Sequence, residues 1–198
     1  MGLIPATAPG ATPLDPDEAQ DLIPAHISTQ AQLNEWELQN IVEGRIWALH
    51  LRKRDLLTLA FMQRLHHRMF GKTWRWAGKF RSSEKNIGID PAQIVVHLTE
   101  LCRDVEAQLE HRAYPVREIA ARFHHRLARI HPFPNGNGRF ARLMADLLLA
   151  DRGDSPFTWG DGDLIAPNEI RRRYIAALRA ADANDYGPLF EFVRLAAG

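Results

Sequence analysis

Apolar residues recur at helical spacing along most of this 198-residue chain. The pattern is strongest in residues 115–130, where one stripe consists of Ile119, Phe123, Leu127 and Ile130. Similar spacing predicts further helices over residues 28–52, 54–71, 92–111, 137–153, 166–184 and 186–198. Strands do not alternate with these segments, and neither an internal repeat nor a heptad run is present. The sequence therefore predicts an all-α fold, and its length suits a single hydrophobic core.

Two regions depart from this periodicity. Residues 1–21 contain four prolines and few large apolar groups, which predicts a mobile N-terminal tail. Residues 72–91 combine aromatic residues, glycines and a final proline, which predicts a loop with a short hairpin near residues 81–89. We therefore divide the chain into the tail, an N-terminal helical segment over residues 22–55 and a core domain over residues 56–198.

Composition excludes several classes of protein. With 45% hydrophobic residues, 25% charged residues and a formal net charge of +1, the chain has no global preference for nucleic acid. The single Cys102 excludes an internal disulfide and a cysteine-rich zinc site, and it fits a reducing compartment. The N terminus lacks a secretory signal, and the apolar stretches are shorter than the ~20 residues that span a bilayer. We expect a cytoplasmic protein without a membrane partner.

A short stretch, IHPFPNGNGRFAR, joins the helices predicted over residues 115–130 and 137–153. Gly136 and Gly138 allow positive φ and a close approach of the backbone to a ligand. Because the second helix begins there, its first N–H groups and its dipole favour an anion. The position of this loop is well defined, since both flanking helices are strongly amphipathic.

Three charged or titratable side chains accompany the loop. Arg139 and Arg142 lie three residues apart, so that two guanidinium groups share one helical face and can contact phosphate oxygens. His131, at the other end of the loop, can accept a proton near neutral pH and thereby activate a hydroxyl group. The combination is typical of a polyphosphate site with an adjacent base.

The stretch HPFPNGNGR, followed by Arg142, resembles the signature of the Fic (filamentation induced by cAMP) or Fido family. The usual form of that signature is His-Pro-Phe-x-Asp/Glu-Gly-Asn-Gly-Arg-x-x-Arg. The segments LHHRMF, WRWAGKFRSSEKNIGI and YIAALRAAD are similar to a subgroup called mobile mystery protein B, and the resemblance extends from about residue 21 to the C terminus. It implies a helical bundle with a small β-hairpin flap in a bacterial enzyme that transfers AMP from ATP to a protein.

The resemblance also implies roles for individual residues. His131 would be the general base that deprotonates a Ser, Thr or Tyr hydroxyl of the target protein. The nucleotide would be bound by Phe133 as a buried anchor of the loop, by Gly136, Asn137 and Gly138 around the phosphates, and by Arg139 and Arg142 at the β- and γ-phosphates. The flap would pair with an extended target segment through Lys85, Asn86, Ile87, Gly88 and Ile89. Magnesium would bridge the phosphate oxygens of ATP.

The sequence departs from the family pattern at two points. Asn135 occupies the position of an acidic magnesium ligand, and its amide oxygen can coordinate the metal but contributes no charge. The inhibitory pattern Ser/Thr-x-x-x-Glu-Gly/Asn has its nearest match in QNIVEGR, where Gln39 replaces the hydroxyl residue before Glu43. We therefore expect ATP to hold most of the metal, and an inhibitor, if there is one, to be a separate antitoxin-like chain.

Other functions remain open at this stage. The same loop geometry suits transfer of phosphate or another phosphate-linked group, and a catalytically weak nucleotide-binding regulatory module is a further alternative. A zinc hydrolase built on His124, His125 and His131 is disfavoured, because adjacent histidines of a helix point in different directions and no His-Glu-x-x-His step is present. The basic run of residues 171–173 is typical of a solvated helix face and argues weakly for nucleic acid.

Overall fold

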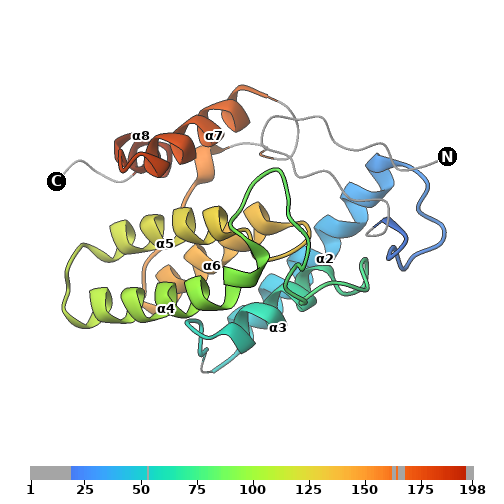
Figure 1. Cartoon of the computed structure of the whole chain (residues 1–198), viewed down its shortest axis with the longest axis horizontal. Helices are drawn as coiled ribbons and strands as arrows, with labels where there is room; N and C mark the ends of the chain where they lie inside the picture. The colour runs from blue at the N-terminus through green and yellow to red at the C-terminus, as the bar shows by residue number, and fades with distance from the viewer. Residues whose placement is uncertain (1–18, 53, 162–163, 165–167, 195–198) are drawn as a thin grey trace.

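The structure, a computed structural model, describes residues 19–52, 54–161, 164 and 168–194 (Figure 1). Its helices are α2 (Gln30–His50), α3 (Leu59–Phe70), α4 (Ile94–Glu110), α5 (Val116–Ile130), α6 (Asn137–Asp151), α7 (Glu169–Asp182) and α8 (Gly187–Phe192), with short 3-10 turns at Pro91–Gln93 and Trp159–Asp161. Within the described residues β pairing is limited to one isolated bridge between Leu22 and Trp74. The predicted all-α fold is confirmed.

Local signals in the sequence explain where the first helices begin and end. The Thr29 hydroxyl accepts a hydrogen bond from the Gln32 backbone, and the Gln32 side chain accepts one from the Thr29 N–H, so a capping box starts α2. Thr58 caps α3 in the same way through the N–H of Phe61, and α3 ends at Gly71, as predicted. Residues 30–50 form one continuous helix.

The core lies between α3, α4, α5 and α6 (Figure 1). Helix α5 packs against both α4 and α6, and its apolar stripe is almost fully buried. Helix α2 packs on α3 at one side of this core, while α7 and α8 pack together and cover α5 from the other side. This arrangement surrounds the α5–α6 connection with side chains from α2, α3 and α7.

The predicted hairpin at residues 81–89 is wrong, because this segment contains no strand. The buried guanidinium of Arg81 holds the loop instead, by donating to the carbonyl oxygens of Ser83, Ile89 and His131. Carbonyl groups that would otherwise pair across two strands are satisfied by one side chain, and Gly88, at φ +109°, turns the chain away from a strand conformation.

The proposed tail lies almost entirely outside the described residues, and the division at residues 22–55 and 56–198 stays a prediction. In the part of the chain that the structure describes, none of the helices has the length and apolar character needed to cross a bilayer.

Candidate active site

Buried side chains hold the loop between α5 and α6 in place. The Asn137 amide accepts from Phe133 N–H at 2.9 Å and donates to the Phe133 carbonyl at 2.7 Å. Phe133 itself is fully buried and stacks on the His66 ring at 3.7 Å between centroids. The oxygen and the nitrogen of the Asn137 amide thus both hold the loop closed.

His66, on α3, supports the loop from below. The N–H of Gly78 donates to Nδ1 of His66 at 3.0 Å, so the ring carries its proton on Nε2 and donates it to the Asn135 carbonyl at 3.1 Å. Complete burial lowers the pKa of His66 to about 3, which keeps the ring neutral. The sequence places His66 only within an apolar helix and contains no signal for this contact.

The N terminus of α6 is open toward the site. Its N-cap is Gly136, at φ +77°, and no side chain caps the helix. The first-turn N–H groups of Asn137, Gly138 and Arg139 are the donors that an α-helix leaves without internal partners. A helix N terminus of this kind favours an anion, and the anion site expected from the sequence stays a prediction.

Two arginines flank this helix terminus but contact different elements. The Arg139 guanidinium lies over the Phe70 ring of α3, 4.9 Å from its centroid, while the Arg142 guanidinium lies 5.5 Å from the ring centroid of Tyr174 on α7. Both arginines are partly exposed. The two cations thus lie on different sides of the α6 terminus, Arg139 toward α3 and Arg142 toward α7.

Glu37 of α2, which the sequence did not indicate, contacts this site directly. Its Oε2 lies 2.5 Å from Nη1 of Arg139, and its Oε1 accepts from Trp74 Nε1 at 2.7 Å. The Glu37 side chain is only 8% exposed. Glu43, the nearest match to an inhibitory glutamate, is exposed and pairs with Lys72. The carboxylate that neutralises a site arginine therefore comes from the buried face of α2, six residues before Glu43.

His131 ends α5 in a left-handed conformation (φ 54°, ψ 60°) and is 6% exposed. Burial lowers the pKa of its imidazole to about 4, and the positive charges of Arg81 and Lys85 act in the same direction. Nδ1 lies 3.4 Å from the Ala128 carbonyl, and a ring that donates there carries its lone pair on Nε2. The neutral imidazole is the form that a general base requires.

The predicted flap residues lie next to His131. Arg81 Nε donates to the His131 carbonyl at 2.7 Å, and a Cβ on Gly88 would lie 2.8 Å from the His131 Cβ. Asn86, Ile87 and Gly88 are exposed, whereas Lys85 and Ile89 are partly buried. The loop over residues 82–88 therefore borders the histidine, and its outer edge faces solvent.

Asn135 offers little to a metal ion. Its Oδ1 accepts from the Gly136 N–H at 2.7 Å, and its carbonyl accepts from His66. The described residues include no group of three or more His, Cys, Asp or Glu side chains able to hold a metal. Both oxygens of Asn135 are thus already engaged in hydrogen bonds at the loop.

Tyr174 of α7 connects Arg142 to the interior. Its hydroxyl lies 3.0 Å from Nε2 of His124, which is fully buried on α5. Burial, together with the charge of Arg142, lowers the pKa of His124 to about 3. Helical periodicity places Tyr174 only on an apolar face and does not indicate that it contacts Arg142 and His124.

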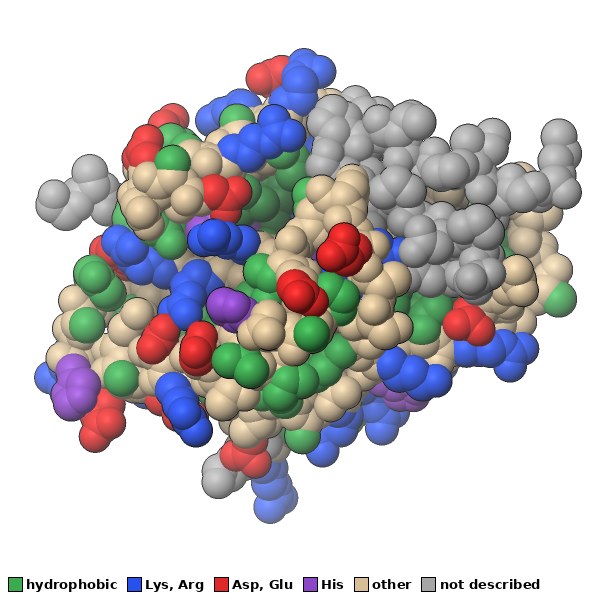
Figure 2. Space-filling view, viewed as in Figure 1, with side chains coloured by type: hydrophobic (Ala, Val, Ile, Leu, Met, Phe, Trp, Pro, Cys, Tyr) green, Lys and Arg blue, Asp and Glu red, His purple; other side chains and the backbone are tan. Residues whose placement is uncertain are grey.

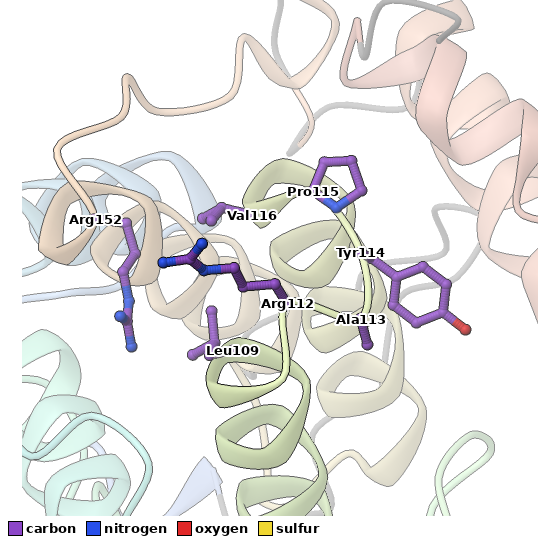
Figure 3. Close-up of a pocket in the computed structure, with 7 residues that line it drawn as sticks. All are labelled: Leu109, Arg112, Ala113, Tyr114, Pro115, Val116 and Arg152. Atoms are coloured by element: carbon purple, nitrogen blue, oxygen red, sulfur yellow. The ribbon is translucent and has the colours of Figure 1, made fainter.

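A hollow lies elsewhere on the surface. It measures about 570 Å³ and is lined by the turn between α4 and α5 together with Arg152, as Figure 3 shows. Since α5 runs for 15 residues from that turn to His131, the hollow and the α5–α6 loop lie at opposite ends of the helix.

The surface charge is mixed. Figure 2 shows basic and acidic side chains interspersed over one face of the molecule, in keeping with the small net charge.

These features define a class: helical proteins in which one inter-helix loop joins a buried histidine to an uncapped helix N terminus with an arginine on each side. Residues 56–149 match the family model described as the Fic/DOC family. The matched residues are just under half of the chain, and over them the chain is similar to the Fic/DOC family.

Curated relatives agree with this assignment. The chain is 29% identical over 146 residues to "Protein adenylyltransferase Fic" of Culex quinquefasciatus, an alignment that covers 71% of this chain and 28% of that protein. It is 27% identical over 147 residues to "Protein adenylyltransferase fic-1" of Caenorhabditis elegans, covering 72% of this chain and 27% of that protein. The chain thus spans less than a third of the length of these relatives.

Solved structures share the fold. A Fic domain of a Bartonella quintana effector with bound ADP is 20% identical, with a TM-score of 0.68, and the match covers 86% of this chain and 87% of that one. The BepC protein of Bartonella tribocorum with bound AMPPNP is 19% identical, with a TM-score of 0.65, covering 84% and 87%. Fic-1 of C. elegans is 27% identical, with a TM-score of 0.61, covering 80% and 48%.

Proposed function

We propose that this chain is a protein adenylyltransferase, which transfers AMP from ATP to a hydroxyl side chain of a target protein. The observation that carries the proposal is the α5–α6 loop, where a neutral, buried histidine lies at one end and an open helix N terminus between two arginines lies at the other. The adenylyltransferase names of the curated relatives support the same activity.

The roles in the reaction follow from this arrangement. His131 accepts the proton of the target hydroxyl as its oxygen attacks the α-phosphorus of ATP. A new phosphorus–oxygen bond forms, the bond between the α-phosphorus and the bridging oxygen breaks, and pyrophosphate leaves. The N–H groups of Gly138 and Arg139 and the two arginine side chains stabilise the negative charge of the phosphates.

Gly138 supports ATP as the ligand. A Cβ at this position would meet no protein atom closer than Arg142 Nη1, at 3.6 Å, and the backbone does not have positive φ. The protein itself therefore does not require glycine here, while a phosphate lying against the helix terminus does. The ADP and AMPPNP bound by two structural relatives are ligands of this chemistry.

Magnesium fits this site only as a companion of the nucleotide. Asn135 Oδ1 would be the protein's ligand to the metal, and that oxygen already accepts a hydrogen bond from the Gly136 N–H. When bound, the metal neutralises charge on the phosphates, whose own oxygens supply the remaining ligands. Proton transfer and phosphate orientation rest on His131, Arg139 and Arg142.

The protein partner is a target whose Ser, Thr or Tyr hydroxyl reaches His131. An extended segment of that target lies along the exposed edge of Asn86, Ile87 and Gly88, where its backbone can form hydrogen bonds. A separate inhibitory chain stays part of the proposal, because Glu43 faces Lys72 rather than either site arginine.

The test is to incubate the purified chain with a protein lysate and ATP that carries label at either the α- or the γ-phosphate. We expect protein to acquire the α-label, and intact-mass analysis to show an added AMP. His131→Ala should reduce transfer about 10²- to 10⁴-fold while ATP binding persists. Transfer of the γ-label would identify a phosphotransferase, and ATP binding without transfer of either label would identify a regulatory module; both results would contradict the proposal.

A further inference from the structure

Helix α2 is apolar on two opposite faces. One face is buried against the rest of the protein through Leu33, Gly44 and Ala48. The other bears four side chains, which we call the outer ridge: Leu38, Val42, Ile46 and Leu49, exposed by 54%, 48%, 50% and 44%. Steps of four, four and three residues place them in one line over three helical turns. An apolar stripe of this length on a polar helix is typical of a surface that is covered in the working assembly.

The charges along α2 are unequally distributed between its ends. Glu35 is exposed one turn before the outer ridge, the exposed Glu43 pairs with Lys72, and the exposed Arg45, His50 and Arg52 lie in the C-terminal part of the helix or just beyond it. A second copy of the helix in antiparallel orientation brings Leu38 close to Leu49 and Val42 close to Ile46. The same register brings Glu35 near the C-terminal end of the partner helix, just before Arg52, whereas a parallel pair would place like charges together. The ridge is therefore complementary to itself in one orientation.

We propose that the outer ridge is a self-association surface, on which α2 pairs antiparallel with α2 of a second copy of this chain about a two-fold axis near Gly44. Such a contact is isologous, since each copy contributes the same residues. One pair of helices buries less than the roughly 800 Å² per partner of a standard stable interface, so the dimer is weak and forms in the micromolar range or above. Glu37 lies on the opposite face of α2, and pairing leaves its contact with Arg139 intact.

Sedimentation velocity of the full chain, from about 1 μM to about 1 mM, tests this proposal. We expect a reversible monomer–dimer equilibrium. Val42→Asp should weaken it by at least about tenfold, because two carboxylates would enter an apolar contact. Val95→Asp is the matched control, since Val95 is an equally exposed valine (51%) on α4, and this variant should dimerise like the parent. A parent chain that stays monomeric throughout, or equal effects of the two variants, would overturn the proposal.

Charge reversal tests the partner and its orientation. Glu35→Lys and Arg52→Glu should each weaken the dimer, because either change sets like charges opposite each other. The double variant restores opposite charges within the antiparallel pair and should recover most of the parent's affinity. All three variants change exposed residues, and circular dichroism checks that their helix content is retained. A double variant weaker than both single variants would rule out the antiparallel pairing.

Discussion

Gly136 and Gly138 stand two residues apart in the loop and are held by different constraints. At Gly136 the backbone has φ +77°, and a Cβ would lie 2.6 Å from the Phe70 ring. At Gly138 the backbone is helical, and a Cβ would have room beside Arg142. The first glycine is required by the fold, and we assign the second to the ligand.

This difference gives a paired prediction. Gly138→Ala should leave stability equal or raise it by up to about 1 kcal/mol, since alanine favours a helix, while ATP binding weakens at least tenfold. Gly136→Ala should lower the free energy of unfolding by more than about 1 kcal/mol. Urea unfolding and ATP titration measure both quantities. Normal ATP affinity in Gly138→Ala would show that no phosphate lies against this position.

The ion pair of Glu37 with Arg139 competes with a nucleotide for the same guanidinium. Glu37→Gln keeps the acceptor for Trp74 but removes the charge, so ATP should bind more tightly, by about tenfold if 1.4 kcal/mol of competition is relieved. Glu43→Gln, on the same helix and paired with Lys72, is the control and should leave ATP affinity unchanged. Isothermal titration calorimetry measures both variants. A larger effect at Glu43 would contradict the assignment of Glu37 to the site.

The loop over residues 82–88 has its shape because one guanidinium replaces the hydrogen bonds of a hairpin. Arg81 is 4% exposed and donates to carbonyl groups of both the loop and the α5–α6 connection. Burial lowers the pKa of Arg81 from its usual value, although an arginine remains charged at neutral pH. The element that is expected to receive the target is therefore attached to the backbone of the catalytic loop.

Arg81→Lys should release this loop, because a single ammonium group cannot reproduce the planar fork of donors. We expect faster amide hydrogen exchange over residues 82–90 and a loss of target modification that exceeds the loss of ATP affinity. Arg75→Lys is the control, since Arg75 is exposed in the same connecting segment. If target modification and ATP affinity fell by the same factor, Arg81 would support the α5–α6 loop as a whole, and residues 82–88 would have no separate role in target binding.

Several buried histidines link the stability of the whole chain to pH. Burial lowers the pKa of His66 and His124 to about 3 and that of His131 to about 4, compared with 6.5 in the unfolded chain. Between these values the unfolded chain binds protons that the folded chain does not, so stability is full above pH 6.5 and is lost as the pH falls. Asp146 acts in the opposite direction, because burial raises the pKa of its carboxyl group.

We therefore predict that the free energy of unfolding decreases on acidification from pH 7 to pH 4, by up to about 1.4 kcal/mol per pH unit for each of the three histidines. Urea unfolding followed by tryptophan fluorescence at a series of pH values measures this dependence. Stability that stayed level or increased over this range would mean that these rings are protonated in the folded state.

The sequence alone determined the features that depend on neighbours along the chain. Helical periodicity and the glycines of the loop act within a few residues, so their pattern predicts local structure directly. The placement of His131 beside an open helix terminus follows for the same reason. The motif does not reveal that the Asn137 amide bonds to the backbone of Phe133 within the loop.

Only the tertiary structure decided which distant side chains complete the site. Glu37 meets Arg139 across 102 residues of sequence, Arg81 reaches the His131 carbonyl across 50, and Tyr174 reaches His124 across 50. Helical spacing indicates that a residue lies on a buried face. It does not indicate which element that face contacts, because many packings of the same helices bury the same apolar stripes. The partner of each buried polar group is set by that packing, since a buried charge or donor must be satisfied wherever the fold places it.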